Sequence, residues 1–151
     1  MRAANAISAA RLLKSRLLLR LGIAMLFPYL MIATGGALGS LLRYTISRTF
    51  APIVGALAFP WATWTINILG SFLIGIAAAY LVDRPTPARR EWYLFFGTGF
   101  CGGFTTFSTF SLEVLYLLRA EKHIIAFVYV STSFLMGLVA VAIGYRWFMD
   151  R

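Results

Sequence analysis

Four stretches of the chain carry no charged residue over the length that a helix needs to cross a membrane. They are Leu21–Leu42, Trp61–Val82, Trp92–Leu112 and Ile124–Tyr145. Each has about 20 residues or more, enough to cross roughly 30 Å of hydrocarbon. None alternates polar with apolar positions, and an isolated sheet edge is not stable in lipid, so all four are predicted to be helices. The pattern predicts an all-α integral membrane protein with four transmembrane helices.

The segments between these stretches contain turn-forming and charged residues. Thr45–Pro60 holds Pro52 and Gly55, and we expect an ordered turn or a short re-entrant excursion there rather than a fifth span. Asp83–Glu91 is polar and interrupted by prolines, and Arg119–His123 joins the last two spans. Short loops of this kind make sequential helices antiparallel neighbours.

The N-terminus differs from the rest of the chain. Residues 1–20 are interpreted as a basic extension, with five basic side chains among leucines and alanines, and residues 21–148 as a four-helix transmembrane domain. The extension suits an anionic membrane surface. A secretory signal is the alternative, but the following apolar run is too long and lacks a good cleavage site. An unstructured extension or a misplaced start at Met25 also stays open.

The orientation in the membrane depends on this extension. With its basic residues counted, the positive-inside rule favours cytoplasmic termini, and without them the charge bias nearly disappears.

Composition agrees with a membrane protein and argues against other classes. Hydrophobic residues make up 60% of the chain, and the mean hydropathy is +0.80. The net charge of +9 comes from residues at the ends of apolar runs, which is a juxtamembrane pattern rather than a nucleic-acid-binding face. Cys101 is the only cysteine and His123 the only histidine, so the sequence offers no intrachain disulfide and no Cys/His metal cluster. These two residues lack a third group to orient them, and an enzyme is not expected.

Three of the predicted helices contain small residues spaced four apart. This spacing allows membrane helices to approach closely, and packing alone would explain it. The pairs are Gly35 and Gly39, Ser71 and Gly75, and Gly99 and Gly103.

Asn67 is the most unusual polar residue within a span. A carboxamide in the middle of the membrane costs a few kcal/mol unless its donors and acceptors are used. It either links helices or offers N–H donors to an anion, and Thr63 lies one turn earlier on the same face. Arg43 and Glu113 are the charges nearest to the spans, and we expect each at an interface, in a hydrogen-bonded pair, or in a gate or anion-attracting vestibule.

The third predicted span combines glycines, hydroxyls and phenylalanines. Phe107 and Phe110 share a helix face, and their ring edges are weakly electropositive, which suits an ion that must also leave. If the helix breaks at Gly102–Gly103, the carbonyls of Gly102 and Thr105 become free ligands for a hard cation; the alternative is an unbroken helix. Hydroxyl groups accompany these residues at Ser108 and Thr109. In the fourth predicted span, Tyr129 and Ser133 are four residues apart and extend a line of hydroxyls along one face, unless they only bond back to the helix carbonyls.

Three motifs in order resemble the Fluc/CrcB family of fluoride channels over residues 25–148. They are GGALGSLLRY from Gly35, TINILGSFLIG from Thr65 and GFCGGFTTFSTFSLE from Gly99, the last being the most specific. The resemblance implies an antiparallel, dual-topology homodimer in the cytoplasmic (inner) membrane, with two fluoride pores along the subunit interface.

The resemblance also implies roles for individual residues. Asn67 would be the pore carboxamide, and the rings of Phe107 and Phe110 would contact the ion. Backbone carbonyls of Gly102 and Thr105 would bind a structural Na⁺ shared by both subunits. The remaining matches are a polar track of Ser108, Thr109, Tyr129 and Ser133, a vestibule threonine at Thr63 and the first-helix arginine at Arg43.

The chain departs from the family pattern in three places. Gly137 stands where some members carry another hydroxyl, Ala62 replaces a usual glycine, and the basic extension is additional.

We therefore expect a fluoride-selective channel for passive efflux that confers fluoride resistance. A small proton-coupled multidrug exporter is the first alternative, but it needs a membrane-buried acid that the first predicted span lacks. A non-transporting scaffold protein is the second, and in it Asn67 and Phe110 would matter only for folding.

Overall fold

The structure, a computed structural model, describes residues 2–57, 59–83 and 86–149, and within these ranges every regular element is a helix. Two of the elements, η1 and η2, have the wider π-helical turn, and each directly follows an α-helix. The order is α1 (Arg2–Leu57), α2 (Trp61–Ala77), η1 (Ala78–Val82), α3 (Pro87–Tyr93), η2 (Leu94–Cys101), α4 (Gly102–Phe104), α5 (Phe107–Arg119) and α6 (His123–Met149).

The chain divides into two compact units, Met1–Leu30 and Met31–Arg151, and helix α1 contributes to both. In the first unit residues 2–30 are helical, and the side chains of Lys14 and Arg16 are exposed. The second unit contains all the other helices, and the site described below lies entirely within it.

Three helices of the described part are long and apolar enough to cross a membrane. They are Met25–Phe50, Trp61–Val82 and His123–Trp147. The second coincides with the predicted span, and the third contains the predicted span Ile124–Tyr145. The prediction of an all-helical membrane protein is therefore confirmed. The third predicted stretch, Trp92–Leu112, is divided among shorter elements.

The prediction of a turn or re-entrant excursion over residues 45–60 is wrong. Helix α1 does not end at Leu42 but continues through Pro52 to Leu57. Proline removes one backbone N–H donor, so a helix that continues through it loses one hydrogen bond. In apolar surroundings this costs less free energy than a loop, which would leave many backbone groups without partners. The hydroxyls of Thr45 and Thr49 donate to carbonyls four residues earlier, at 3.0 and 3.1 Å, and so follow the helical hydrogen-bonding pattern.

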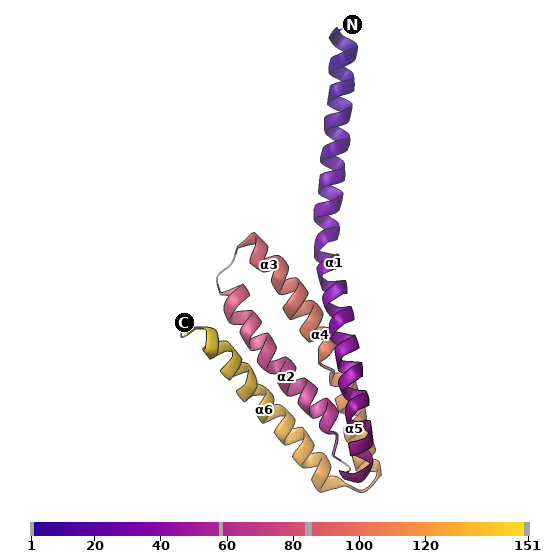
Figure 1. The fold of residues 1–151 in the computed structure, drawn as a ribbon, viewed down its shortest axis with the longest axis vertical. Helices are drawn as coiled ribbons and strands as arrows, with labels where there is room; N and C mark the ends of the chain where they lie inside the picture. The colour runs from indigo at the N-terminus through magenta and orange to yellow at the C-terminus, as the bar shows by residue number, and fades with distance from the viewer. Residues whose placement is uncertain (1, 58, 84–85, 150–151) are drawn as a thin grey trace. The chain divides into compact units, whose positions relative to one another are not determined.

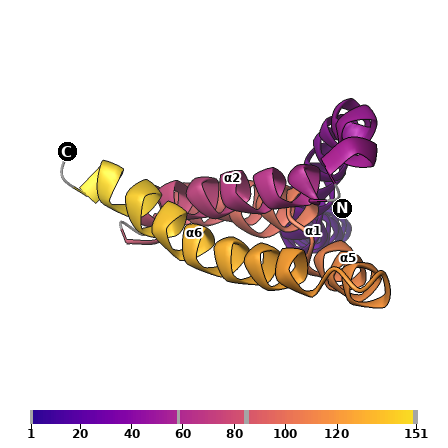
Figure 2. The same ribbon diagram turned by 90° about the horizontal axis from the view of Figure 1, so that it is seen from below.

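The core of the second unit forms where α2 packs along α6 (Figures 1 and 2). Glycines allow this close approach. A Cβ atom on Gly75 would lie 2.3 Å from the carbonyl oxygen of Val141, and one on Gly144 would lie 2.2 Å from that of Phe72. No side chain fits at these distances, so the two backbones are in direct contact.

Helical structure in the region of the third predicted span begins earlier in the chain than expected, at Pro87 instead of Trp92. Thr86 caps α3 by accepting a hydrogen bond from the N–H of Arg89 at 3.2 Å, and Pro87 occupies the first turn, where its missing N–H has no cost. Residues 87–91, expected in a loop, are therefore helical. The α5–α6 connection at residues 120–122 is as short as predicted, and Glu121 turns it with a positive φ of 59°.

Candidate functional site

The third predicted span is interrupted at Thr105 and Thr106, where the backbone is extended. Thr105 has φ −80° and ψ 160°, and Thr106 has φ −150° and ψ 116°. The expected position of the break, Gly102–Gly103, is wrong by two to three residues, because both glycines are helical and belong to α4. The predicted interruption of this span is thus present, and threonines rather than glycines form it.

Asn67 of α2 binds the break at two points. Its Oδ1 accepts a hydrogen bond from the backbone N–H of Thr106 at 2.9 Å, and its Nδ2 donates to the carbonyl of the same residue at 3.2 Å. The Oδ1 atom thereby replaces the helical acceptor that the Thr106 N–H has lost, and Nδ2 adds a donor to the Thr106 carbonyl, which is the N-cap carbonyl of α5. One of the two Nδ2 hydrogens remains for a further partner.

The break releases two carbonyl groups from their usual helical donors. The N–H of Thr106, which would donate to the Gly102 carbonyl in a continuous helix, donates to Asn67 instead. The N–H of Thr109, which would donate to the Thr105 carbonyl, donates to the Thr106 hydroxyl at 3.2 Å and so begins α5 with an N-cap. Gly102 and Thr105 are the two residues whose carbonyls were expected to be free.

Helix α1 contacts the same region from another side. The carbonyl of Gly103 accepts hydrogen bonds from Arg43 Nε at 3.1 Å and from Ser40 Oγ at 3.4 Å. A Cβ atom on Gly103 would lie 2.4 Å from the carbonyl oxygen of Gly36, so only glycine permits this approach.

An open cavity of about 680 Å³ lies beside the break. Most of its surface is apolar, and its polar groups come from the break and from both core helices. The Ser133 hydroxyl is buried and has no hydrogen-bond partner within the described ranges. The polar and aromatic lining consists of Asn67, Ser71, Cys101, Thr105, Thr106, Phe107, Phe110, Ser133 and Phe134.

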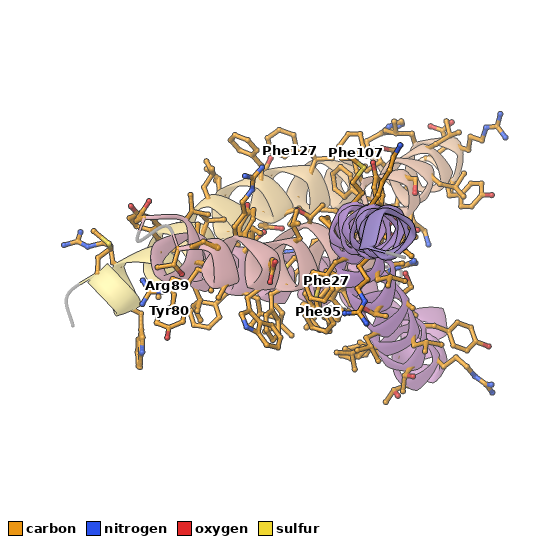
Figure 3. All side chains as sticks on the ribbon, turned by 90° about the horizontal axis from the view of Figure 1, so that it is seen from above. Phe27, Tyr80, Arg89, Phe95, Phe107 and Phe127 are labelled. Carbon is orange, nitrogen blue, oxygen red and sulfur yellow. The ribbon has the colours of Figure 1, made fainter. Side chains whose placement is uncertain are left out.

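Two phenylalanine rings form one wall of the cavity. The ring centroids of Phe107 and Phe110 are 5.8 Å apart, with the planes inclined by 35°. Phe107 is 80% exposed and points outward, on the same side as Phe127 (Figure 3). Phe110 is half-buried, and its ring lies 5.0 Å from that of Tyr129. One ring is therefore held by its neighbours and the other is open to a partner.

A carboxylate that is not among the cavity-lining residues contacts Tyr129, the neighbour of Phe110. Glu113 accepts a hydrogen bond from the Thr63 hydroxyl at 2.8 Å and another from the Tyr129 hydroxyl at 2.7 Å. Thr63 is 3% exposed and Tyr129 0% exposed. The two donors use both oxygens of the carboxylate and fix Tyr129 against Phe110.

The predicted site residues therefore occupy three adjoining environments. The cavity collects Asn67, Phe107, Phe110, Ser133, Gly102 and Thr105. Thr63 and Tyr129 bind Glu113 instead, so the expected hydroxyl line from Tyr129 to Ser133 is divided between two surroundings. Ser108 and Thr109 both bond to the Thr106 hydroxyl, at 3.3 and 3.0 Å, and Arg43 bonds to Gly103.

Sequence reasoning missed three residues of this region. Thr106 is the hinge of the break, Ser40 is the second donor to Gly103, and Ser71 lines the cavity beside Gly137, whose Cβ position would lie 3.5 Å from the Ser71 hydroxyl. A signal for Thr106 was available, since threonine is one of the residues preferred at a helix N-cap. Ser40 and Ser71 had no comparable signal, because serines inside helices usually bond to their own backbone.

Comparison with known proteins adds an independent observation. The family model described as CrcB-like protein, Camphor Resistance (CrcB), matches residues 30–145. That range begins near the start of the second unit and includes every residue of the site.

Individual relatives are similar over most of their own length. The fluoride-specific ion channel FluC of Erythrobacter litoralis is 42% identical over 122 residues, which cover 79% of this chain and 90% of that protein. FluC of Leptospira interrogans is 43% identical over 109 residues, covering 72% and 84%. FluC 1 of Listeria innocua is 44% identical over 120 residues, covering 80% and 96%.

Proposed function

The chain belongs to the CrcB family, and from this membership we propose that it is a fluoride-specific ion channel. It is a multi-pass membrane protein that lets fluoride leave the cytoplasm passively across the inner membrane, down its electrochemical gradient. No step of this activity needs a catalytic residue, and the chain is not an enzyme.

The observation that carries the proposal is the juxtaposition of Asn67 with Phe107 and Phe110 around one cavity. Fluoride is small and strongly hydrated, so a selective path has to replace its water with closely spaced donors. Asn67 retains one amide hydrogen, and Ser133 supplies an unpartnered hydroxyl. The positive ring edges of the phenylalanines add weak contacts that do not trap the ion.

Two copies of the chain complete the channel in this proposal. The cavity is open on one side, and Phe107 projects beside it with most of its surface uncovered. Polar groups that line the open cavity, such as that of Asn67, are costly against lipid, so covering them with a second copy is favourable. We infer an inverted homodimer of four-span subunits, the third span being the one broken at Thr105–Thr106. Opposite insertion brings the two breaks together near the midplane, as in proteins with inverted repeats.

The freed carbonyls suit a structural Na⁺ at the junction of the two copies. Carbonyl oxygens are the ligands that hard cations prefer, and each subunit offers those of Gly102 and Thr105. A bound Na⁺ would supply positive charge and a link between the subunits. The residues of this chain do the rest of the positioning: Asn67 holds Thr106, and Thr106 directs the start of α5 and its two rings.

The remaining predicted residues act around this centre. Ser108, Thr109, Tyr129 and Ser133 continue the polar path in the proposal, and Thr63 with Arg43 lines the approach to it. Chloride would be excluded because a path fitted to fluoride is too narrow for it.

A liposome efflux assay tests the proposal. Vesicles containing the purified protein and loaded with fluoride or chloride should release fluoride, detected with an ion-selective electrode, and retain chloride. The variant Phe110→Ile should lose fluoride release while keeping the elution volume of the wild type. Equal release of both anions by the wild type would contradict selectivity, and dye uptake driven by a proton gradient would favour an exporter instead. Efflux unchanged by Phe110→Ile would contradict the assigned role of the ring.

A further inference from the structure

Arg43 makes a contact that the proposed pore chemistry does not use. It lies inside the apolar helix Met25–Phe50, where a guanidinium is expensive to bury, and it is half-buried. Its Nε donates to the carbonyl of Gly103 at 3.1 Å, across 60 residues of sequence. Ser40, one turn earlier on α1, donates to the same carbonyl at 3.4 Å. Two side chains of one helix therefore bind one backbone oxygen of another.

The Gly103 carbonyl that accepts these hydrogen bonds lies directly before the break. Gly103 lies in the last helical turn before the break, where carbonyls lose their helical donors. It stands between Gly102 and Thr105, whose carbonyls have also lost their usual partners. Of these three carbonyls, Gly103 alone receives side-chain hydrogen bonds from α1. Within the described part of the chain, the usual helical donors of the other two carbonyls bond elsewhere, to Asn67 and to the Thr106 hydroxyl.

We propose that Arg43 and Ser40 form an anchor that holds the Gly103 carbonyl, and that Arg43 is thereby a positioning residue for conduction. The anchor fixes the end of α4 to α1, while Asn67 fixes Thr106 to α2. The extended pair Thr105–Thr106 is therefore held from both ends. The anchor keeps the Gly102 and Thr105 carbonyls turned away from helical geometry and keeps α5, with Phe107 and Phe110, in place.

This role differs from attraction of an anion by a positive charge. An arginine that only attracted anions could be replaced by any cation of similar reach and would not need its Nε on a carbonyl. A charge-assisted hydrogen bond also has a definite geometry, which a positioning role requires. The inference rests on the proposed channel function where fluoride efflux is measured. The NMR measurement described below depends only on the hydrogen bonds to the Gly103 carbonyl.

The test uses the full chain in lipid vesicles. Arg43→Met removes the donor while retaining an apolar side chain, and fluoride efflux should fall roughly ten- to a hundredfold, as expected from loss of a hydrogen bond to a charged group. Ser40→Ala removes the neutral donor and should lower efflux only a few-fold. Arg43→Lys keeps the positive charge but not the Nε donor, so efflux should stay well below that of the wild type, and full recovery would favour attraction of the anion instead. Arg48→Met is the matched control, because Arg48 is exposed on the same helix.

A carbonyl NMR signal separates positioning from a general effect on folding. Labelling glycine with ¹³C at the carbonyl and phenylalanine with ¹⁵N selects two peptide bonds, Gly99–Phe100 and Gly103–Phe104. In Arg43→Met the Gly103 signal should move upfield as its hydrogen bond is lost, while the Gly99 signal stays in place as an internal control. Arg48→Met should move neither signal.

Several outcomes would overturn the inference. An unmoved Gly103 signal in Arg43→Met would show that the anchor does not exist, and a moved signal with wild-type efflux would show that conduction does not depend on it. If Arg43→Met does not fold, Ser40→Ala decides the matter, and wild-type efflux together with an unchanged Gly103 signal would count against the anchor. If the wild type conducts no fluoride, the proposed function fails, and the NMR signal still decides whether the anchor exists.

Discussion

Asn67 and Thr106 exchange two hydrogen bonds across the gap between α2 and the break in the third predicted span. Thr106 donates its backbone N–H to Asn67 Oδ1 at 2.9 Å, and Asn67 donates Nδ2–H to the Thr106 carbonyl at 3.2 Å. The same carboxamide both satisfies the broken backbone and faces the cavity. Removing the whole side-chain amide abolishes both roles at once. Replacing only its N–H donor should affect the role in the cavity more than the hydrogen bond to the Thr106 N–H.

Asn67→Leu should be destabilising, because it leaves the Thr106 N–H without an acceptor and removes one of the donors to the Thr106 carbonyl. One unsatisfied buried group costs about 1–3 kcal/mol, so the free energy of unfolding should fall by about that amount. Asn67→Asp keeps the acceptor for the Thr106 N–H and should be less destabilising, yet it removes the N–H donor and should abolish fluoride efflux. The measurements are the unfolding midpoint in detergent and electrode-detected efflux. A conducting Asn67→Asp channel would contradict a donor role for this amide.

Phe107 and Phe127 offer a matched comparison of two exposed rings. They are 80% and 72% exposed and point to the same side of the unit (Figure 3), but only Phe107 lines the cavity beside Phe110. Phe107→Ile should reduce fluoride efflux about tenfold or more, equivalent to at least about 1.4 kcal/mol of lost ion stabilisation. Phe127→Ile should leave efflux near the wild-type value. Equal losses in both variants would mean that exposed aromatic area, rather than the ring pair, supports conduction.

The hydrogen bonds to Glu113 should contribute to stability. Glu113→Gln replaces one accepting oxygen by an NH₂ group, so either Thr63 or Tyr129 loses its acceptor. The expected loss is about 1–3 kcal/mol in the free energy of unfolding, with reduced efflux because Tyr129 packs on Phe110. Glu121→Gln, at an exposed position in the α5–α6 turn, is the control and should change neither quantity. A Glu113→Gln protein as stable as the wild type would show that the two hydroxyls find other partners.

Close approach of α1 to the third predicted span can be tested with glycines of the same helix. A Cβ atom on Gly39 would lie 2.2 Å from the Phe100 carbonyl oxygen, whereas one on Gly36 would have its nearest neighbour at 3.7 Å. Gly39→Ala should therefore destabilise the protein by about 1–3 kcal/mol through overpacking, and Gly36→Ala should be tolerated. Thermal unfolding followed by size-exclusion chromatography measures both. If the two variants unfold at the same temperature, the helices are not in the contact described.

The segments that could be predicted from the sequence are those whose structure depends on local composition. Trp61–Val82 has the same limits in the structure as in the prediction, because an uninterrupted apolar run in lipid has no alternative to a helix. The structure of residues 45–60 was predicted wrongly because proline and glycine were interpreted as turn-forming residues, as they are in soluble proteins. In α1 the helix continues past Pro52, where the loss of one donor is a smaller cost than an exposed loop.

Local composition also identified most of the candidate site, although it did not establish how the site is organised. A carboxamide within a span, a pair of phenylalanines three residues apart and a run of hydroxyls were enough to select Asn67, Phe107, Phe110 and Ser133, which line one cavity. Each is unusual in an apolar helix and can be recognised without knowing its neighbours. The family motifs strengthened the same selection.

The position of the break, and the partners that hold it, were decided only by the tertiary structure. The sequence favours Gly102–Gly103, since glycine is the weakest helix former in that stretch. The chain opens instead at Thr105–Thr106, where Asn67, 39 residues earlier, replaces the lost backbone acceptor, and Arg43 and Ser40 bind Gly103 from α1. In an apolar environment a helix opens where other groups can satisfy its backbone, and the location of those groups depends on how distant segments pack together.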